Sequence, residues 1–181
     1  ATPEALVARA VELGLRGLAL VDEGSLSGAV RFIRAAERAG LIQNVSRILF
    51  VKALDAVECW PSSITVSFNL SAQDLADRAF IFSLVAEVTR RGIAPSRIEF
   101  EITETAAIAS FSQANRFIQA LKDLGCKFAL DDFGTGLSSF GYLKHFPVDV
   151  LKIDGSFVKE ILHDPIDREM VRSINEIGHL T

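Results

Sequence analysis

The sequence has few cysteines, no excess of basic residues and no long hydrophobic run, and each absence argues against a class of protein. The two cysteines, Cys59 and Cys126, have no C-x-x-C spacing, so we expect small buried apolar residues in a reducing, cytoplasmic location. With 19 basic and 23 acidic residues the net charge is −4, which argues against a nucleic-acid polymer as partner. No apolar run reaches the roughly 20 residues of a membrane span. The N-terminus has no basic segment before an apolar one, so we expect no secretory signal.

The sequence does have a regular alternation of extended and helical patterns. Nearly continuous apolar runs predict strands over residues 17–21, 63–69, 98–103, 127–131 and 148–153. Amphipathic spacing, with prolines and glycines at the expected ends, predicts helices over residues 2–14, 27–40, 43–60, 79–91, 112–124 and 167–180. Because 49% of the residues are hydrophobic, residues 1–181 can fill the core of a single α/β domain.

Alternating strands and helices with short loops predict a parallel sheet. Two architectures fit this prediction: part of a TIM-like (β/α) barrel, or an open flavodoxin-like sheet with helices on both faces. Five strands are predicted, whereas a closed barrel needs eight. In either architecture, right-handed crossovers bring the carboxyl ends of all the strands to one rim.

Polar side chains stand at the ends of four consecutive predicted strands. They are Asn69, Glu101, the adjacent pair Asp131 and Asp132, and Lys152. A single Asp or Asn at a strand end usually caps a loop, but two adjacent carboxylates repel each other unless a cation or a base lies nearby. Oxygen ligands of this kind suit Mg²⁺, Mn²⁺ or Ca²⁺, and a pair of such ions can activate water against a phosphodiester. The pattern therefore predicts a divalent-metal site, with a lysine placed to bind a phosphate oxygen.

The motifs around these residues resemble the EAL domain family over residues 32–181. The motifs are Phe-Asn-Leu-Ser-Ala-Gln-Asp-Leu (68–75), Glu-Ile-Thr-Glu (101–104), Leu-Asp-Asp-Phe-Gly-Thr-Gly-Leu-Ser-Ser (130–139), Phe-Pro-Val-Asp-Val-Leu-Lys-Ile-Asp (146–154) and Ala-Glu-Arg-Ala-Gly-Leu-Ile (36–42). The resemblance implies a barrel phosphodiesterase of bacterial signalling that opens cyclic di-GMP to linear pGpG with Mg²⁺ or Mn²⁺.

The resemblance also implies a role for each residue of the predicted site. Asn69, Glu101 and Asp131 would be metal ligands. Asp132 would serve the second metal and the attacking water, and Lys152 would act at the scissile phosphate. Glu104 would brace the loop 133–139, which in the family couples the metal site to dimerisation, so a homodimer is one expected state.

Three features of the family pattern are missing, and one of them is the family's first strand, which has no visible counterpart in the sequence. The predicted strand 17–21 is followed by Asp22 and Glu23, where the signature Glu-Ala-Leu would supply a metal-binding glutamate. The family also continues with two further strands after the last predicted helix. The loss of a shared ligand weakens both metal sites, so we expect trace-level hydrolysis of cyclic di-GMP at most.

Residues 1–41 resemble the start of a PHP domain, with Val21-Asp22-Glu23 where that family has Thr-Asp-His. Either the chain is a chimera of two barrel fragments joined within 27–40, or residues 1–41 are a diverged N-terminus of the EAL-like portion at 42–181. Three functions remain open at this point: a weakly active phosphodiesterase, a non-catalytic module that binds a nucleotide or a protein, and a folding scaffold assembled from barrel fragments.

Overall fold

The structure is a computed structural model that describes residues 5, 8–9, 12, 34–36, 38–109, 111–135 and 140–180. The predicted strand 17–21 lies outside these residues, as do most of the predicted helices 2–14 and 27–40. The junction of the predicted chimera lies outside them for the most part as well. None of the helices within the described ranges is both long and apolar enough to cross a membrane.

The chain divides into two compact units, residues 1–55 and 56–181. The boundary falls inside helix α3 (Ile42–Cys59). The second unit carries the sheet and all six predicted site residues. The prediction of one domain over residues 1–181 stays a prediction.

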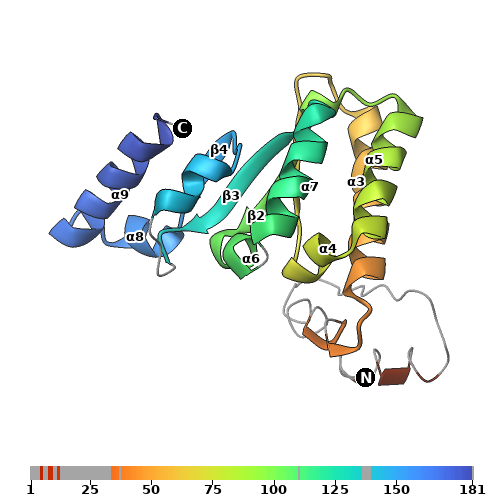
Figure 1. The fold of residues 1–181 in the computed structure, drawn as a ribbon, viewed down its shortest axis with the longest axis horizontal. Coiled ribbons are helices and arrows are strands. Elements are labelled where there is room, and N and C mark those ends of the chain that lie inside the picture. Colours follow the sequence, from red (N-terminus) through yellow and green to blue (C-terminus); the bar gives the residue numbers. More distant parts are fainter. Residues whose placement is uncertain are drawn as a thin grey trace. The chain divides into compact units, whose positions relative to one another are not determined.

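The second unit repeats strand and helix along the chain (Figure 1). After α3, the elements follow in this order: β1 (Val66–Asn69), α4 (Ala72–Ala76), α5 (Arg78–Arg91), the 3₁₀ turn η1 (Pro95–Arg97), β2 (Ile98–Thr103), α6 (Glu104–Ala109), α7 (Phe111–Asp123), β3 (Lys127–Phe133), the 3₁₀ turn η2 (Phe140–His145), β4 (Val150–Ile153), α8 (Gly155–Lys159) and α9 (Pro165–Gly178).

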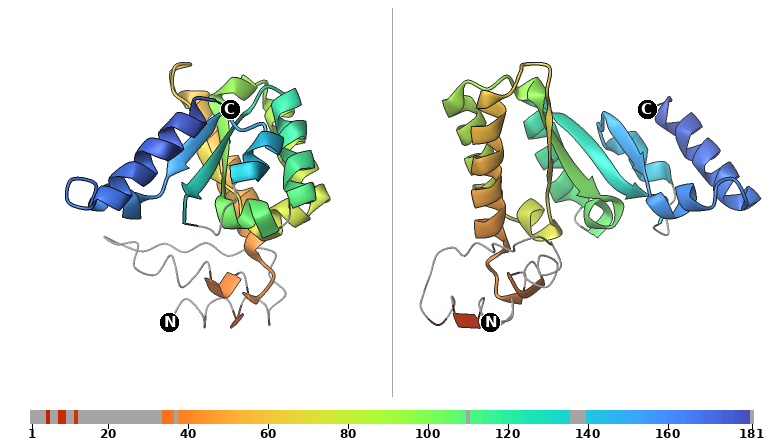
Figure 2. Two further views of the ribbon diagram at one scale, coloured as in Figure 1. Left: turned by 60° about the vertical axis from the view of Figure 1, so that its left-hand side comes forward. Right: turned by 180° about the vertical axis from the view of Figure 1, so that it is seen from behind.

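The strands form one parallel sheet in the order β1-β2-β3-β4, so each strand pairs with the next one in sequence. Figure 2 shows the strands from two further sides. In a flavodoxin-like sheet the strand order reverses at a switch point, and helices then cover both faces. Over these four strands the order never reverses, and right-handed crossovers in one direction put the connecting helices on one face. The observed order is that of a (β/α) barrel, which confirms the first of the two predicted architectures.

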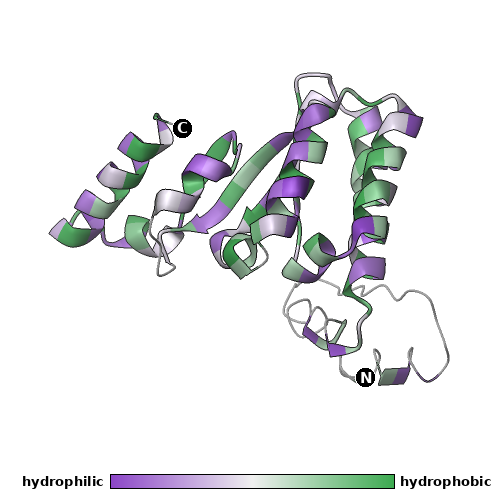
Figure 3. Ribbon diagram, in the orientation of Figure 1, coloured by the Kyte–Doolittle hydropathy of each residue, from purple (hydrophilic) through white to green (hydrophobic). Residues whose placement is uncertain are grey.

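Phenylalanines join the helix-covered face of the sheet to α7. Phe117 of α7 is 3% exposed. Its ring makes edge-on contacts with Phe100 of β2 and Phe128 of β3, at centroid distances of 6.3 and 6.0 Å. Along α7 the hydrophobic and hydrophilic residues alternate at helical spacing (Figure 3). The helix is therefore amphipathic, and its hydrophobic side faces the sheet. This packing fixes β2 and β3, the two strands that carry Glu101, Asp131 and Asp132.

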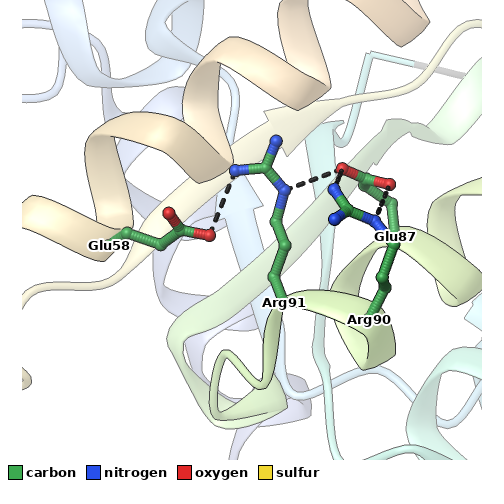
Figure 4. A network of polar contacts seen from close by, with 4 residues as sticks. All are labelled: Glu58, Glu87, Arg90 and Arg91. Atoms are coloured by element: carbon green, nitrogen blue, oxygen red, sulfur yellow. Dashed lines mark hydrogen bonds and ion pairs between the residues drawn. The ribbon is translucent and has the colours of Figure 1, made fainter.

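Side chains of α5 and η1 hold the C-terminal end of α3. Arg91 bridges Glu58 of α3 and Glu87 of its own helix, at 3.1 and 2.7 Å, and Arg90 also binds Glu87 (Figure 4). Arg97 donates to four carbonyl oxygens, those of Val57, Trp60, Pro61 and Ile64. The last carbonyls of a helix have no partner inside it, and here a guanidinium group supplies donors to the end of α3 and the turn after it.

Predicted and observed boundaries differ mainly where short elements occur. Within the described ranges the long helices and four strands were predicted, but β1 begins at Val66 and β3 continues to Phe133. The short helices α4, α6 and α8 were not predicted, because five or six residues are too few to show a helical period. Helix α4 depends instead on a capping box between Ser71 and Asp74. Gly92 ends α5 at φ 64°, the left-handed cap that the sequence predicts.

Candidate active site

The polar face of the sheet, opposite the helix-covered face, carries most of the predicted site. Asn69 pairs in register with Glu101, and Asp131 pairs with Thr103, two residues further along β2. Side chains two residues apart in a strand share a face, so Asn69, Glu101 and Asp131 lie on the polar face near the carboxyl ends of their strands. Lys152 reaches the same face from β4, since its ammonium group contacts Glu101.

Glu101 and Lys152 form an ion pair at the centre of the polar face. Glu101 is 4% exposed, and its Oε1 accepts a hydrogen bond from Lys152 Nζ. A second carboxylate, Glu99, has its Oε1 at 3.9 Å from the same Nζ. Burial alone would lower the pKa of Lys152, but the hydrogen bond to Glu101 and the charges of Glu101, Glu99 and Asp131 outweigh it and raise the pKa. Lys152 therefore stays an ammonium ion at neutral pH.

Asp132 lies beside Asp154. Its backbone has φ 54°, a left-handed conformation that is uncommon outside glycine. Burial, the charges of Asp131 and Asp154 and a side-chain hydrogen bond with Asp154 raise its pKa. Hydrogen bonds from Ser156 lower the pKa of Asp154. The pKa values of these two neighbouring carboxyl groups are therefore shifted in opposite directions.

Glu104 lies off the polar face and holds the segment after β3. It is 1% exposed, and its carboxylate accepts hydrogen bonds from the Gly134 N–H at 2.9 Å and from the Tyr142 hydroxyl at 2.7 Å. The sequence predicts Glu104 as a brace for the loop 133–139. Residues 136–139 lie outside the described residues, so only the start of this loop is in view.

Sequence reasoning missed Glu99 and Tyr142, which contact Lys152 and Glu104 of the predicted set, and Ser67, which contacts Glu99. Glu99 and Ser67 lie on the polar face, where Ser67 Oγ donates to Glu99 Oε1 at 2.8 Å. Glu99 and Ser67 precede Glu101 and Asn69 by two residues. Because residues two apart in a strand lie on the same face, this spacing could have predicted both positions. Tyr142 follows Glu104 by 38 residues, and no local pattern connects the two.

The donor types on the polar face suit a hard divalent cation, because Asn69, Glu101 and Asp131 all present oxygen. Within the described ranges, however, there is no group of three or more Asp, Glu, His or Cys side chains that could hold a metal ion. Asn69, Glu101 and Asp131 suit such an ion because their side chains carry oxygen atoms and lie on the same face of the sheet. A bound cation would compete with Lys152 for Glu101.

A hollow of about 520 Å³ lies elsewhere in the second unit, between α4, α5 and α7. It is lined mainly by apolar side chains, among them Leu75, Phe82 and Phe117, and by none of the polar-face residues. Its chemistry is separate from that of the candidate site.

The sequence pattern of the EAL domain family matches residues 18–180. Among curated proteins, the cyclic di-GMP phosphodiesterase PdeB of Shewanella oneidensis is 34% identical over 158 residues, which are 85% of this chain and 18% of that protein. The cyclic di-GMP phosphodiesterase PdeR of Escherichia coli is 34% identical over 155 residues, or 84% of this chain and 23% of that protein. The chain thus spans about a fifth of the length of the curated relatives it matches.

Solved structures match the fold closely. The PaMucR phosphodiesterase in complex with c-di-GMP gives a TM-score of 0.79 at 31% identity, covering 83% of this chain and 67% of that one. The FimX EAL domain from Pseudomonas aeruginosa bound to c-di-GMP gives 0.83 at 25% identity, covering 99% and 81%.

The family match begins at residue 18, inside the segment that resembles a PHP domain. For residues 18–41 it supports a diverged N-terminus of the same domain over a chimera.

Proposed function

The chain belongs to the EAL domain family, and from this membership we propose that its polar face binds cyclic di-GMP and hydrolyses one phosphodiester bond to give linear pGpG with Mg²⁺ or Mn²⁺. Two relatives bear the name of this activity, and two similar solved structures hold the same nucleotide. The observation that carries the proposal is the shared face of Asn69, Glu101, Asp131 and Lys152 at the carboxyl ends of parallel strands.

In the proposed reaction, Asn69, Glu101 and Asp131 would hold a divalent cation through their oxygen atoms. When bound, such a cation lowers the pKa of a water molecule and offsets charge on the phosphate. Lys152 binds a non-bridging phosphate oxygen and stabilises the negative charge that grows there. Asp132, the neighbour of Asp131 in the sequence, would serve a second cation and accept the proton of the attacking water. The water oxygen bonds to phosphorus as one ester P–O bond breaks, and the departing ribose oxygen takes up a proton.

The test is manganese-dependent conversion of cyclic di-GMP to pGpG, followed by chromatography over long incubations. Because the predicted strand 17–21 and the residues after it lack the Glu-Ala-Leu signature, we expect a trace-level rate. Lys152→Met should lower this rate by about 100-fold or more, the usual cost of losing a group that stabilises transition-state charge. Lys127→Met, at the opposite end of β3, is the matched control and should keep the wild-type rate. Conversion that is absent, or that does not depend on Lys152, would contradict the proposal.

A second candidate is a module that binds cyclic di-GMP without hydrolysis. The ion pair between Lys152 and Glu101 favours it, since the ammonium group occupies a carboxylate oxygen that a catalytic cation needs. Calorimetry with cyclic di-GMP and Ca²⁺ separates the candidates. Binding without any product in the manganese assay supports the second, and no binding at high micromolar nucleotide contradicts both.

A further inference from the structure

Lys152 has two carboxylate partners on the polar face, and only one of them belongs to the proposed ligand set. Its Nζ donates to Glu101 Oε1 and lies 3.9 Å from Glu99 Oε1. Ser67 Oγ donates at 2.8 Å to that same oxygen of Glu99. The hydroxyl group therefore fixes the Glu99 carboxylate in place beside the ammonium group, on the same strand as Glu101.

A divalent cation and the Lys152 ammonium group compete for Glu101, because both are positive and Glu101 is nearly buried. If the cation binds Glu101, the ammonium group of Lys152 needs another carboxylate as its partner. Otherwise two positive groups would share the single negative charge of Glu101 at a site that is partly shielded from water. Within the described ranges, the salt-bridge partners of Lys152 are Glu99 and Glu101.

We propose that Glu99 is a positioning residue that receives the Lys152 ammonium group when a divalent cation takes Glu101. The inference rests on the proposed function, because it presumes a cation at Glu101. The movement is small, since a charged hydrogen bond of about 2.8 Å requires Nζ to approach Glu99 by only about 1 Å from its present distance. The flexible four-carbon stem of lysine permits this shift, and Ser67 keeps the accepting oxygen where the ammonium group can reach it.

The test measures Mn²⁺ affinity by electron paramagnetic resonance in wild type, Glu99→Gln, Lys152→Met and the double variant, with no nucleotide present. We expect Glu99→Gln to weaken Mn²⁺ binding by about 10-fold, the lower end of the cost of losing a group that orients a metal ligand. In the Lys152→Met background the same change should have an effect under about 2-fold, because there is no ammonium group left to relocate. Glu99→Asp keeps the carboxylate and should restore part of the affinity.

Two controls keep the result interpretable. Glu169→Gln removes an exposed carboxylate from α9 and should leave Mn²⁺ affinity unchanged within about 2-fold. If Glu99→Gln does not fold, Ser67→Ala replaces it, with a smaller loss of affinity that must also depend on Lys152.

The outcomes separate this inference from the proposed function. Equal losses from Glu99→Gln in both backgrounds show a general charge effect and overturn the role of Glu99 alone. No loss in the wild-type background overturns it as well. A wild-type chain that binds no Mn²⁺ overturns the proposed metal site, and the role of Glu99 with it.

Discussion

Glu104 carries a carboxylate that is 1% exposed, and two hydrogen-bond donors offset the cost of that burial. One donor is the backbone of Gly134, directly after β3, and the other is the hydroxyl group of Tyr142 in η2. A single side chain thus ties the end of β2 to both sides of the segment that follows β3. Tyr142 is a partner that the sequence did not predict, and the role of Glu104 as a brace for the loop 133–139 stays a prediction.

We expect Tyr142→Phe to destabilise the chain by about 1–3 kcal/mol, because it leaves a buried carboxylate oxygen without this donor. Urea unfolding followed by circular dichroism measures the change in free energy of unfolding. Arg172→Gln, which breaks exposed ion pairs on α9, is the control and should cost under about 1 kcal/mol. Equal stability of Tyr142→Phe and wild type would show that the hydroxyl group does not support Glu104.

At the scale of elements, charges near the end of α5 connect this helix to the end of α3 (Figure 4). Glu87 binds both Arg90 and Arg91, and Arg91 also reaches Glu58. The two arginines lie in the last turn of α5, where positive charge also interacts favourably with the helix dipole. Hydrogen bonds from Arg90 and Arg91 lower the pKa of Glu87 from 4.5 to about 2.

This shift predicts a pH dependence of stability. Because the pKa of Glu87 is lower in the folded state, its contribution is present above pH 4.5 and is lost as the pH falls through about 2. Glu87→Gln should therefore be less stable than wild type at pH 7, and the difference should shrink between pH 4.5 and 2. Urea midpoints at pH 7, 4.5, 3 and 2 measure it.

The control for this series is Asn175→Ala, a change between neutral residues at an exposed position of α9. Its difference from wild type should not vary with pH. A Glu87→Gln difference that stays constant from pH 7 to pH 2 would contradict the assignment of the shift to the two arginines.

At the scale of the whole second unit, the sheet separates two kinds of chemistry. The helix-covered face is apolar and holds Phe100 and Phe128 under α7, whereas the opposite face presents Asn69, Glu101 and Lys152. The polar side chains depend on strands that are fixed from the other side. Packing against α7 is thus what keeps β2 and β3 in the register that brings the polar groups together.

Phe117→Ala should cost about 3–5 kcal/mol, since it removes a buried ring that touches both central strands. The matched control is Phe82→Ala on α5, where the ring is 64% exposed and the expected change is about 0.5 kcal/mol. Thermal and urea unfolding compare the two phenylalanines directly. Similar losses at both positions would show that Phe117 is not central to the packing of the sheet.

The sequence by itself determined the α/β class, the parallel strands and the family, because apolar runs, glycine stops and strand-end motifs are local patterns of adjacent residues. It also placed Asn69, Glu101, Asp131 and Lys152 at strand ends, since parallel strands present their carboxyl ends at one edge. Only the tertiary structure decided between barrel and flavodoxin order, because strand order depends on packing between distant segments. It alone showed that Lys152 binds Glu101 beside Glu99, and that Asp132 turns toward Asp154. Those contacts depend on the register between neighbouring strands and on the left-handed backbone of Asp132, and no local sequence pattern encodes either of them.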